Sequence, residues 1–186
     1  MSILLGLAPF IAFFVVMRLS TPLIALAAAA VIAAALSARG LAKGGSVKIL
    51  ELGSVLLFGL LALYTWIAAP DWSVAGVRLA VDGGLTAIVL LSLAIRRPFT
   101  IQYAREQTPP AFWHQPLFIR TNDIITAVWA LYFLICSLCD AAALWVPAVP
   151  LWLEVALSIG ALLGAIYFSS WYPARIRRNI PRGASA

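Results

Sequence analysis

Four ionisable side chains lie inside or at the ends of long apolar runs, and they are the first candidates for chemistry. Arg78 and Asp82 stand four residues apart within one run, whereas Asp140 ends another run and Glu154 begins the next. The four-residue spacing predicts that Arg78 and Asp82 share one face of a helix and form an ion pair. Ionisable groups at membrane depth often bind protons or ions. In the structural alternative the pair only stabilises the fold, Arg78 reaches outward, and Asp140 and Glu154 meet water at the boundary.

Two cysteines form a C-x-x-C spacing, Cys136 and Cys139, within an apolar run. Thiols inside an apolar helix behave as small hydrophobic groups, so we favour packing over redox chemistry. A structural zinc site needs four cysteine or histidine ligands, and the chain has three such residues with His114 expected on the opposite side of the membrane. We therefore expect no metal and no cofactor. The common hydrolase, metalloprotease and nucleotide-binding motifs do not occur, which leans against an enzyme.

A polar and aromatic stretch, residues 96–122, separates two apolar runs. We expect it to lie at the membrane surface, where each arginine contributes about 1 kcal/mol of attraction to anionic lipid. Glu106 and His114 are a candidate acid–base pair, but only threonines stand nearby as nucleophiles, so docking is favoured over catalysis. The candidate docking or lipid site comprises Arg96, Arg97, Arg105, Trp113, His114 and Arg120.

The backbone of this stretch is expected to be irregular. Phe99, Ile101 and Tyr103 alternate with less apolar residues, and this period of two predicts an extended segment. Pro109 and Pro110 block a regular helix around them.

The elements that position these residues follow from composition. Of 186 residues, 63% are hydrophobic and 11% are charged, whereas soluble domains carry about 25% charged residues. The sequence therefore predicts one all-α domain over residues 1–186, a polytopic bundle of membrane helices. At roughly 20 residues per crossing, we expect six spans, the first two short, at residues 3–18, 22–38, 49–69, 74–95, 123–145 and 151–172.

The basic residues predict the orientation of these spans. Eleven of the 13 fall in the second and fourth gaps and in the tail, and the positive-inside rule then places both termini in the cytoplasm. The first span is read as a retained helix because no basic residue precedes its apolar core. In the alternative, residues 3–38 form a re-entrant hairpin, which would bring Arg18 near the membrane centre at a cost of a few kcal/mol.

Small residues predict where helices approach closely. Gly83 and Gly84 follow Asp82, and the second span is rich in alanine. Ala156, Gly160 and Gly164 recur every four residues on the last span. Such small-xxx-small faces pack membrane helices of one chain or of two copies, so a homo-oligomer is an open alternative.

The stretch around residue 96 also carries a family resemblance. A basic-basic-proline end to one span, followed by proline, tryptophan, asparagine and an aromatic-rich span, resembles the intracellular septation protein A family. The matching residues are Arg96, Arg97, Pro98, Pro110, Trp113, Asn122, Trp129 and Phe133. The opening segment LAPFIAFFVVMRLSTPLIALAAA is similar too. The resemblance implies an inner-membrane protein with a role in cell-envelope maintenance or division.

Three functions follow as hypotheses. The leading one is a non-enzymatic protein of the bacterial inner membrane that acts through lipid, chiefly anionic, or through envelope or division proteins. The second is a small proton- or ion-coupled transporter or channel that uses the face of Arg78 and Asp82. The third is a membrane enzyme that acts on lipid at residues 96–122. A nucleic-acid partner is not expected, because the basic residues form short clusters where orientation signals lie.

Overall fold

The computed structural model describes residues 6–42, 44, 48–146 and 150–178, and this part of the chain is helical without strands. Five helices are long and apolar enough to cross a membrane, which indicates a membrane-spanning protein. They are α3 (Pro22–Ala42), α4 (Ile49–Ala68), α5 (Val74–Ala94), α7 (Pro116–Trp145) and α8 (Leu151–Arg178). Three shorter elements accompany them: α2 (Ala8–Leu19), α6 (Phe99–Arg105) and the 3-10 turn η1 (Pro110–Phe112).

The two N-terminal helices differ in length. With 21 residues, α3 is about 31 Å long and is not the short span expected over residues 22–38. With 12 residues, α2 is about 18 Å long, less than the roughly 30 Å of a hydrocarbon core. Residues 3–5 of the expected first span lie outside the described residues. The sixth crossing therefore stays a prediction.

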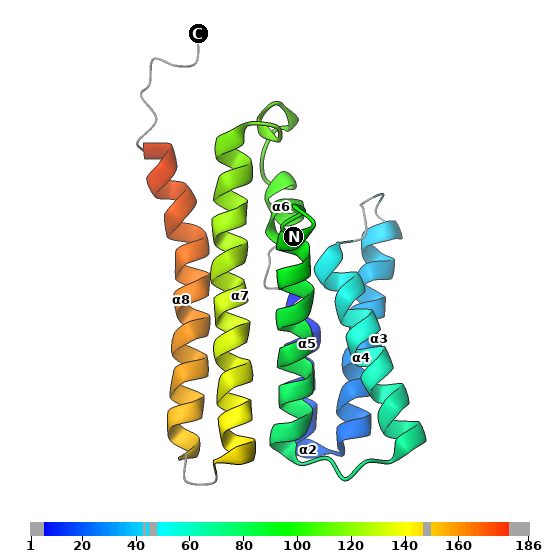
Figure 1. The fold of residues 1–186 in the computed structure, drawn as a ribbon. Coiled ribbons are helices and arrows are strands. Elements are labelled where there is room, and N and C mark those ends of the chain that lie inside the picture. The colour runs from blue at the N-terminus through cyan, green and yellow to red at the C-terminus, as the bar shows by residue number, and fades with distance from the viewer. Residues whose placement is uncertain (1–5, 43, 45–47, 147–149, 179–186) are drawn as a thin grey trace.

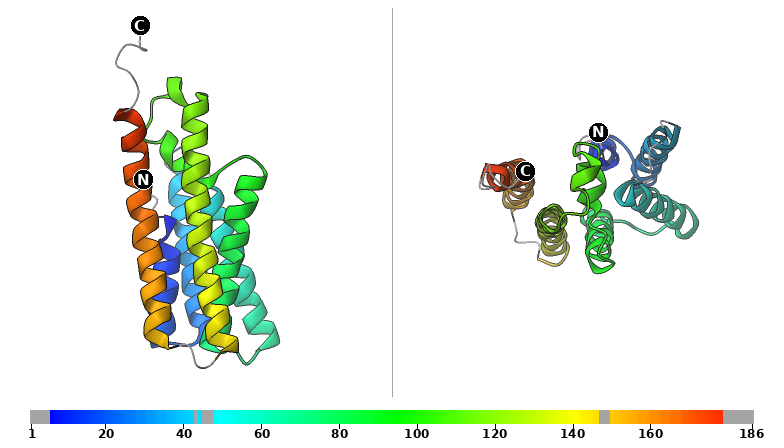
Figure 2. Two further views of the ribbon diagram at one scale, coloured as in Figure 1. Left: turned by 60° about the vertical axis from the view of Figure 1, so that its left-hand side comes forward. Right: turned by 90° about the horizontal axis from the view of Figure 1, so that it is seen from above.

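The connections between the long helices gather at two ends of the molecule (Figures 1 and 2). One end, here named the basic end, holds the C-terminal end of α3, the first turn of α4, the segment from α5 to α7 with α6 and η1, and the C-terminal end of α8. The α2–α3 turn lies at the other end beside the α4–α5 loop, since Thr21, Pro22, Pro70 and Trp72 line one cleft. Arg18 is exposed there at the end of α2.

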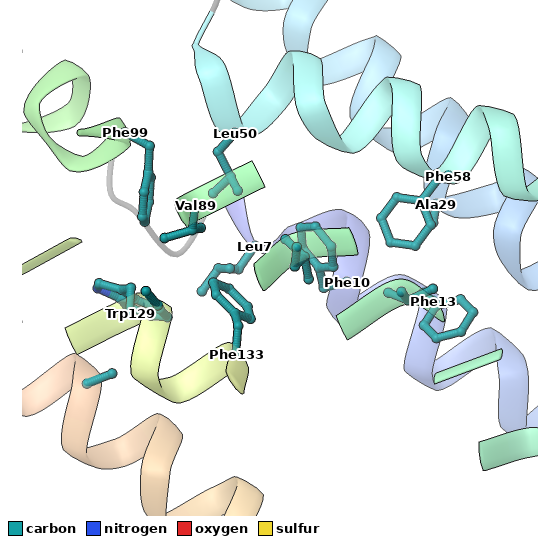
Figure 3. Packing of buried hydrophobic residues seen from close by; sticks show 14 of the residues in the cluster. Leu7, Phe10, Phe13, Ala29, Leu50, Phe58, Val89, Phe99, Trp129 and Phe133 are labelled. Atoms are coloured by element: carbon teal, nitrogen blue, oxygen red, sulfur yellow. The ribbon is translucent and has the colours of Figure 1, made fainter. Parts of the chain in front are cut away.

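Alanine and phenylalanine side chains join the N-terminal helices. Ala25, Ala29 and Ala33 are buried on one face of α3, as expected for an alanine-rich packing surface. The ring centroid of Phe58 of α4 lies 5.0 Å from that of Phe10 and 5.7 Å from that of Phe13, both of α2 (Figure 3). Edge and tilted ring pairs at these separations stabilise a core beyond the area they bury.

The two adjacent glycines of α5 have different surroundings. A Cβ at Gly84 would lie 2.3 Å from Leu57 Cδ1 of α4, so the Leu57 side chain would have to shift to admit any larger residue here. A Cβ at Gly83 would meet no atom within 4 Å. Only one of the pair therefore serves the close approach of α4 and α5.

Helix α8 lies at one edge and packs chiefly on α7 (Figure 2). Its small-residue face does not pack within the described chain: Ala156, Gly160 and Gly164 are exposed, and a Cβ added at either glycine would meet no atom within 4 Å. Of the two alternatives that the sequence left open, packing against another helix of the same chain is not seen among the described residues. A second copy as its partner stays a prediction.

The segment at residues 99–104 corrects another prediction, because it forms helix α6 and not an extended strand. The helix is held on several sides at once. Thr100 Oγ1 donates to the Asn122 carbonyl at 3.0 Å and lies 2.7 Å from Thr126 Oγ1 of α7. The Gln102 side chain accepts from the Ile49 N–H at 2.7 Å. Its polar residues therefore bond to neighbours, and the alternation does not mark a solvent face.

The last two long helices are also longer than predicted. Helix α7 begins at Pro116, seven residues before the expected start at 123, because proline suits the first position of a helix. Helix α8 continues through Pro173 to Arg178, past the expected end at 172. Both extensions lie at the basic end, where they form the walls of a pocket.

Candidate functional site

A buried charge cluster joins three helices near the end opposite the basic end. Arg78 of α5 places Nη2 2.8 Å from Asp140 Oδ1 of α7 and forms a second salt bridge with Glu154 of α8. Asp140 is fully buried and Glu154 is 4% exposed. The Arg78 guanidinium also lies 5.8 Å from the Phe14 ring of α2. One arginine thus links α5, α7 and α8.

This arrangement overturns two expectations. The predicted ion pair of Arg78 with Asp82 is replaced by pairs with Asp140 and Glu154. Neither of those carboxylates meets water, although both stand near helix ends. The reason is that α7 and α8 turn these residues toward α5, so helix packing and not distance from the helix end decides their exposure.

Asp82 lies one turn deeper on α5 and is 5% exposed. Its carboxyl lies beside that of Asp140, whose oxygens are buried with no hydrogen-bond partner among the described residues apart from the Arg78 salt bridge. One turn further along α5, Thr86 Oγ1 donates to the Asp82 carbonyl and lies 3.2 Å from Ser137 Oγ of α7. A polar strip therefore runs between α5 and α7 from Arg78 to Thr86.

The two cysteines stand beside this strip on α7. Both thiols are free, with Cys136 buried and Cys139 partly buried. Cys136 lies beside Ser158 of α8. Among the described residues, no group of three or more histidine, cysteine and acidic side chains is arranged to hold a metal ion.

A pocket of about 750 Å³, here named the α6–α8 pocket, lies at the basic end. Its lining comes from α6, the segment after it, the first half of α7 and the last third of α8. Leu117 and Trp129, which both line it, stand twelve residues apart on α7, about 18 Å along the helix axis. The lining residues are Thr100, Tyr103, Ala104, Gln107, Thr108, Pro109, Phe112, Gln115, Leu117, Phe118, Thr121, Asn122, Ile125, Trp129, Ile166, Ser169, Ser170, Pro173, Ala174 and Ile176.

A few neutral polar groups lie within the apolar lining of this pocket. Trp129 Nε1 of α7 donates to Ser169 Oγ of α8 at 3.0 Å, and this hydrogen bond links the two helices at the floor of the pocket. Pro173 has no N–H, so the Ser169 carbonyl four residues earlier loses its helical donor. Asn122 Nδ2 donates to the Phe118 carbonyl at 2.8 Å. The pocket therefore has an aromatic floor and hydroxyl and carbonyl groups on its walls.

None of the predicted docking residues lines this pocket. The Arg105 guanidinium lies 5.3 Å from the Trp113 ring, and Trp113 Nε1 donates to the Thr108 carbonyl at 2.8 Å. These contacts order the segment after α6. His114 and Arg120 are exposed, and the structure does not bring His114 to a described partner. Exposed Arg96 and Arg97 form the turn after α5.

That turn has a defined backbone pattern. Arg96 has φ 55°, in the left-handed region. The Arg97 N–H donates to the Ser92 carbonyl and the Arg96 N–H to the Leu93 carbonyl, both at 2.9 Å. This pair of bonds is the Schellman motif, which usually has glycine at the left-handed position. The turn reverses the chain so that α6 packs beneath the basic end.

A second junction at the basic end involves Lys48, which the sequence interpretation used only as an orientation signal. Lys48 Nζ lies 2.8 Å from Glu106 Oε1, 3.6 Å from Glu51 Oε1 and 4.5 Å from the centroid of the Tyr103 ring. Partial burial raises the pKa of Glu106. The hydrogen bond and the charge of Lys48 lower this pKa by more than burial raises it, so it lies below its usual value. Burial raises the pKa of the Tyr103 phenol. The three-residue spacing of Lys48 and Glu51 was the one signal of this junction in the sequence.

Comparison with protein-family models, with curated proteins and with solved structures gives no match.

Proposed function

We propose that this chain is a non-enzymatic, six-span protein of the bacterial inner membrane that binds an anionic phospholipid in the α6–α8 pocket. The basic end then faces the cytoplasm, in accord with the positive-inside rule. The α2–α3 turn lies beside the α4–α5 loop, which favours a crossing of the membrane by α2 over a re-entrant hairpin.

The chemistry of the pocket lining is the observation that carries this proposal. No carboxylate, imidazole, amine or thiol is among the residues that line it. The serine and threonine hydroxyls that do line it would need an adjacent general base to act as nucleophiles, and no carboxylate or imidazole of the lining supplies one. Aromatic and aliphatic walls with a few neutral polar groups are typical of binding sites of roughly 300–1,000 Å³. The pocket therefore suits binding better than catalysis.

The dimensions of the pocket support an acyl chain as its occupant. The lining runs about 18 Å along α7 from Leu117 to Trp129. One leaflet of a bilayer has a hydrocarbon thickness of roughly 15 Å, half of the whole core. An acyl chain from the leaflet at the basic end thus matches the pocket in length and in polarity.

Arginines beside the pocket support an anionic headgroup. Arg105 follows lining residue Ala104, Arg120 precedes lining residue Thr121, and Arg175 stands between two lining residues of α8. The Arg175 guanidinium lies 5.1 Å from the Trp171 ring. A negatively charged headgroup at this level would meet favourable charge from three sides.

The envelope role rests on the resemblance to the intracellular septation protein A family. Several of the residues that carry it belong to this region: Asn122 and Trp129 line the pocket, and Trp113 orders the segment beside it. A bound lipid at this place supports a role in envelope maintenance or division, either by itself or with a protein partner.

The test is lipid retention after purification in native membrane discs and exchange into detergent. Wild-type protein is expected to retain anionic phospholipid, measured by mass spectrometry. Ser170→Trp fills the pocket from α8 and is expected to lose that lipid. Leu163→Trp is the matched control, since Leu163 is 61% exposed on α8 outside the pocket, and it should retain the lipid. Equal retention by both variants, or no retained anionic lipid in the wild type, would overturn the proposal.

The other two functions have less support. The lipid-enzyme alternative would need Arg105, Glu106 and His114 to converge on the pocket, and none of them lines it. The transporter alternative draws on the buried charge cluster, which lies away from the two cavities described.

A further inference from the structure

The buried charge cluster contains more carboxyl groups than cationic groups. Three acidic residues, Asp82, Asp140 and Glu154, are each at most 5% exposed. Arg78 is the one basic side chain that forms salt bridges with them among the described residues. If every carboxyl were ionised, two negative charges would be buried without a counter-charge. Such charges cost several kcal/mol each in a membrane interior.

The neighbours of Asp82 single out which carboxyl is unpaired. Asp140 and Glu154 each contact the Arg78 guanidinium, whereas Asp82 has no salt bridge within the described residues. Its carboxyl instead lies beside that of Asp140, on the same facing sides of α5 and α7 as the Thr86–Ser137 pair, and both Asp140 oxygens are buried without a hydrogen-bond donor among the described residues apart from the Arg78 salt bridge. Two ionised carboxylates repel each other at contact distance, and a hydrogen bond between them requires a proton.

The remaining groups around the pair offer no compensating cation. The other titratable side chains that interact with Asp82 or Asp140 are Tyr132, Cys136 and Cys139, all on α7. These phenol and thiol groups are neutral in their protonated forms. Deeper along the strip stand the hydroxyl groups of Thr86 and Ser137. A proton on a carboxyl group therefore lowers the uncompensated charge of the cluster from two negative charges to one.

We propose that Asp82 and Asp140 form a proton-binding dyad that holds one proton near neutral pH. The proton comes from water. The protonated Asp82 carboxyl donates its O–H to the Asp140 carboxylate, and Asp140 accepts a charge-assisted bond from Arg78 through its Oδ1. No covalent bond other than the O–H bond forms or breaks. Two carboxyl groups that share one proton are the usual result of such close contact.

The dyad differs from the ion pair that sequence spacing predicted. An Arg78–Asp82 pair would keep Asp82 ionised, whereas a pair with Asp140 leaves Asp82 to hold a proton. The dyad is independent of the lipid pocket, which lies at the basic end. Its test therefore leaves the proposed function unaffected whichever way it comes out.

Infrared spectroscopy of the protein in lipid discs tests this inference. The wild type is expected to show the C=O stretch of a protonated carboxyl near neutral pH, shifted by deuterium exchange and by carbon-13 labelling of aspartate. Asp82→Asn should abolish the band and keep wild-type thermal stability, since an amide resembles the protonated acid in shape and charge. Asp71→Asn, which alters a carboxyl in the α4–α5 loop, should change neither.

Three outcomes would overturn the dyad. The first is no protonated aspartate band in the wild type near neutral pH. The second is a band that persists in Asp82→Asn. The third is a labelled band that disappears in Asp71→Asn. If Asp82→Asn does not fold, the wild-type spectrum with labelled aspartate still decides, because an ionised Asp82 would give no such band.

Discussion

Replacing Arg78 by methionine should detach α8 from the bundle. The guanidinium bridges Asp140 of α7 and Glu154 of α8, and both carboxylates are buried. Methionine fills similar volume but leaves two carboxylates without a cation. Removing one partner of a buried ion pair costs about 3–5 kcal/mol, because the remaining charge is uncompensated. We expect Arg78→Met to lower the free energy of unfolding by that amount.

The reactivity of Cys136 can report the separation of α8 from α7. The Cys136 thiol of α7 is 4% exposed and lies beside Ser158 of α8. In a Cys139→Ser background, the rate at which a membrane-permeant maleimide labels Cys136 reports the opening of α7 from α8. Arg78→Met should raise that rate on the order of a hundredfold or more, since each 1.4 kcal/mol corresponds to a factor of ten.

A compensating variant decides whether charge is the cause. The triple variant Arg78→Met, Asp140→Asn, Glu154→Gln removes the charges together and should recover most of the lost stability and protection. A stability within 1 kcal/mol of wild type for Arg78→Met, or a triple variant as unstable as the single one, would refute the reasoning.

Three further predictions concern packing, a turn and pH. Gly84→Ala should lower stability in a detergent unfolding titration by about 1–3 kcal/mol through overpacking, whereas Gly83→Ala should raise it by up to about 1 kcal/mol because a helical glycine is replaced without a clash; equal effects would contradict the packing. Arg96→Gly should raise the midpoint of thermal unfolding by relieving the left-handed backbone, a gain of up to about 1 kcal/mol, and a lower midpoint would contradict this. Because the folded-state pKa of Glu106 is lowered, its ion pair with Lys48 should add a few tenths of a kcal/mol above about pH 4.5 and lose that contribution as pH falls through the folded pKa. Lys48→Met should abolish this part of the acid dependence, and an unchanged acid profile would refute it.

The long helices could be predicted from the sequence because their signal is local. Apolar runs bounded by prolines and basic residues gave α4 and α5 to within a few residues. The same local signals ended the last span at Pro173 too early, because a proline inside a helix is tolerated where a neighbour or solvent bonds the freed carbonyl. The alternation at residues 99–104 was too short to distinguish a strand from a helix that is bonded on several sides.

The partners of Arg78 could not be predicted from spacing. The four-residue rule describes contacts within one helix, whereas Arg78 contacts Asp140 and Glu154 across three helices. All four charged residues were nevertheless recognised as candidates from their apolar surroundings. The α6–α8 pocket was not predicted, because its walls depend on how far α7 and α8 extend beyond the expected spans.

The position of the α6–α8 pocket at one end of the membrane helices has a consequence for its selectivity. A lipid that reaches the pocket by diffusion within the leaflet competes with every other lipid of that leaflet. The occupancy of the pocket would therefore depend on the mole fraction of that lipid and not on an aqueous concentration. Arg105, Arg120 and Arg175, at about 1 kcal/mol each for an anionic headgroup, would enrich the pocket roughly a hundredfold over neutral lipid. With that preference the pocket would be half occupied by anionic lipid at a mole fraction of about 1%, so it would stay filled in a leaflet where anionic lipid is a common component.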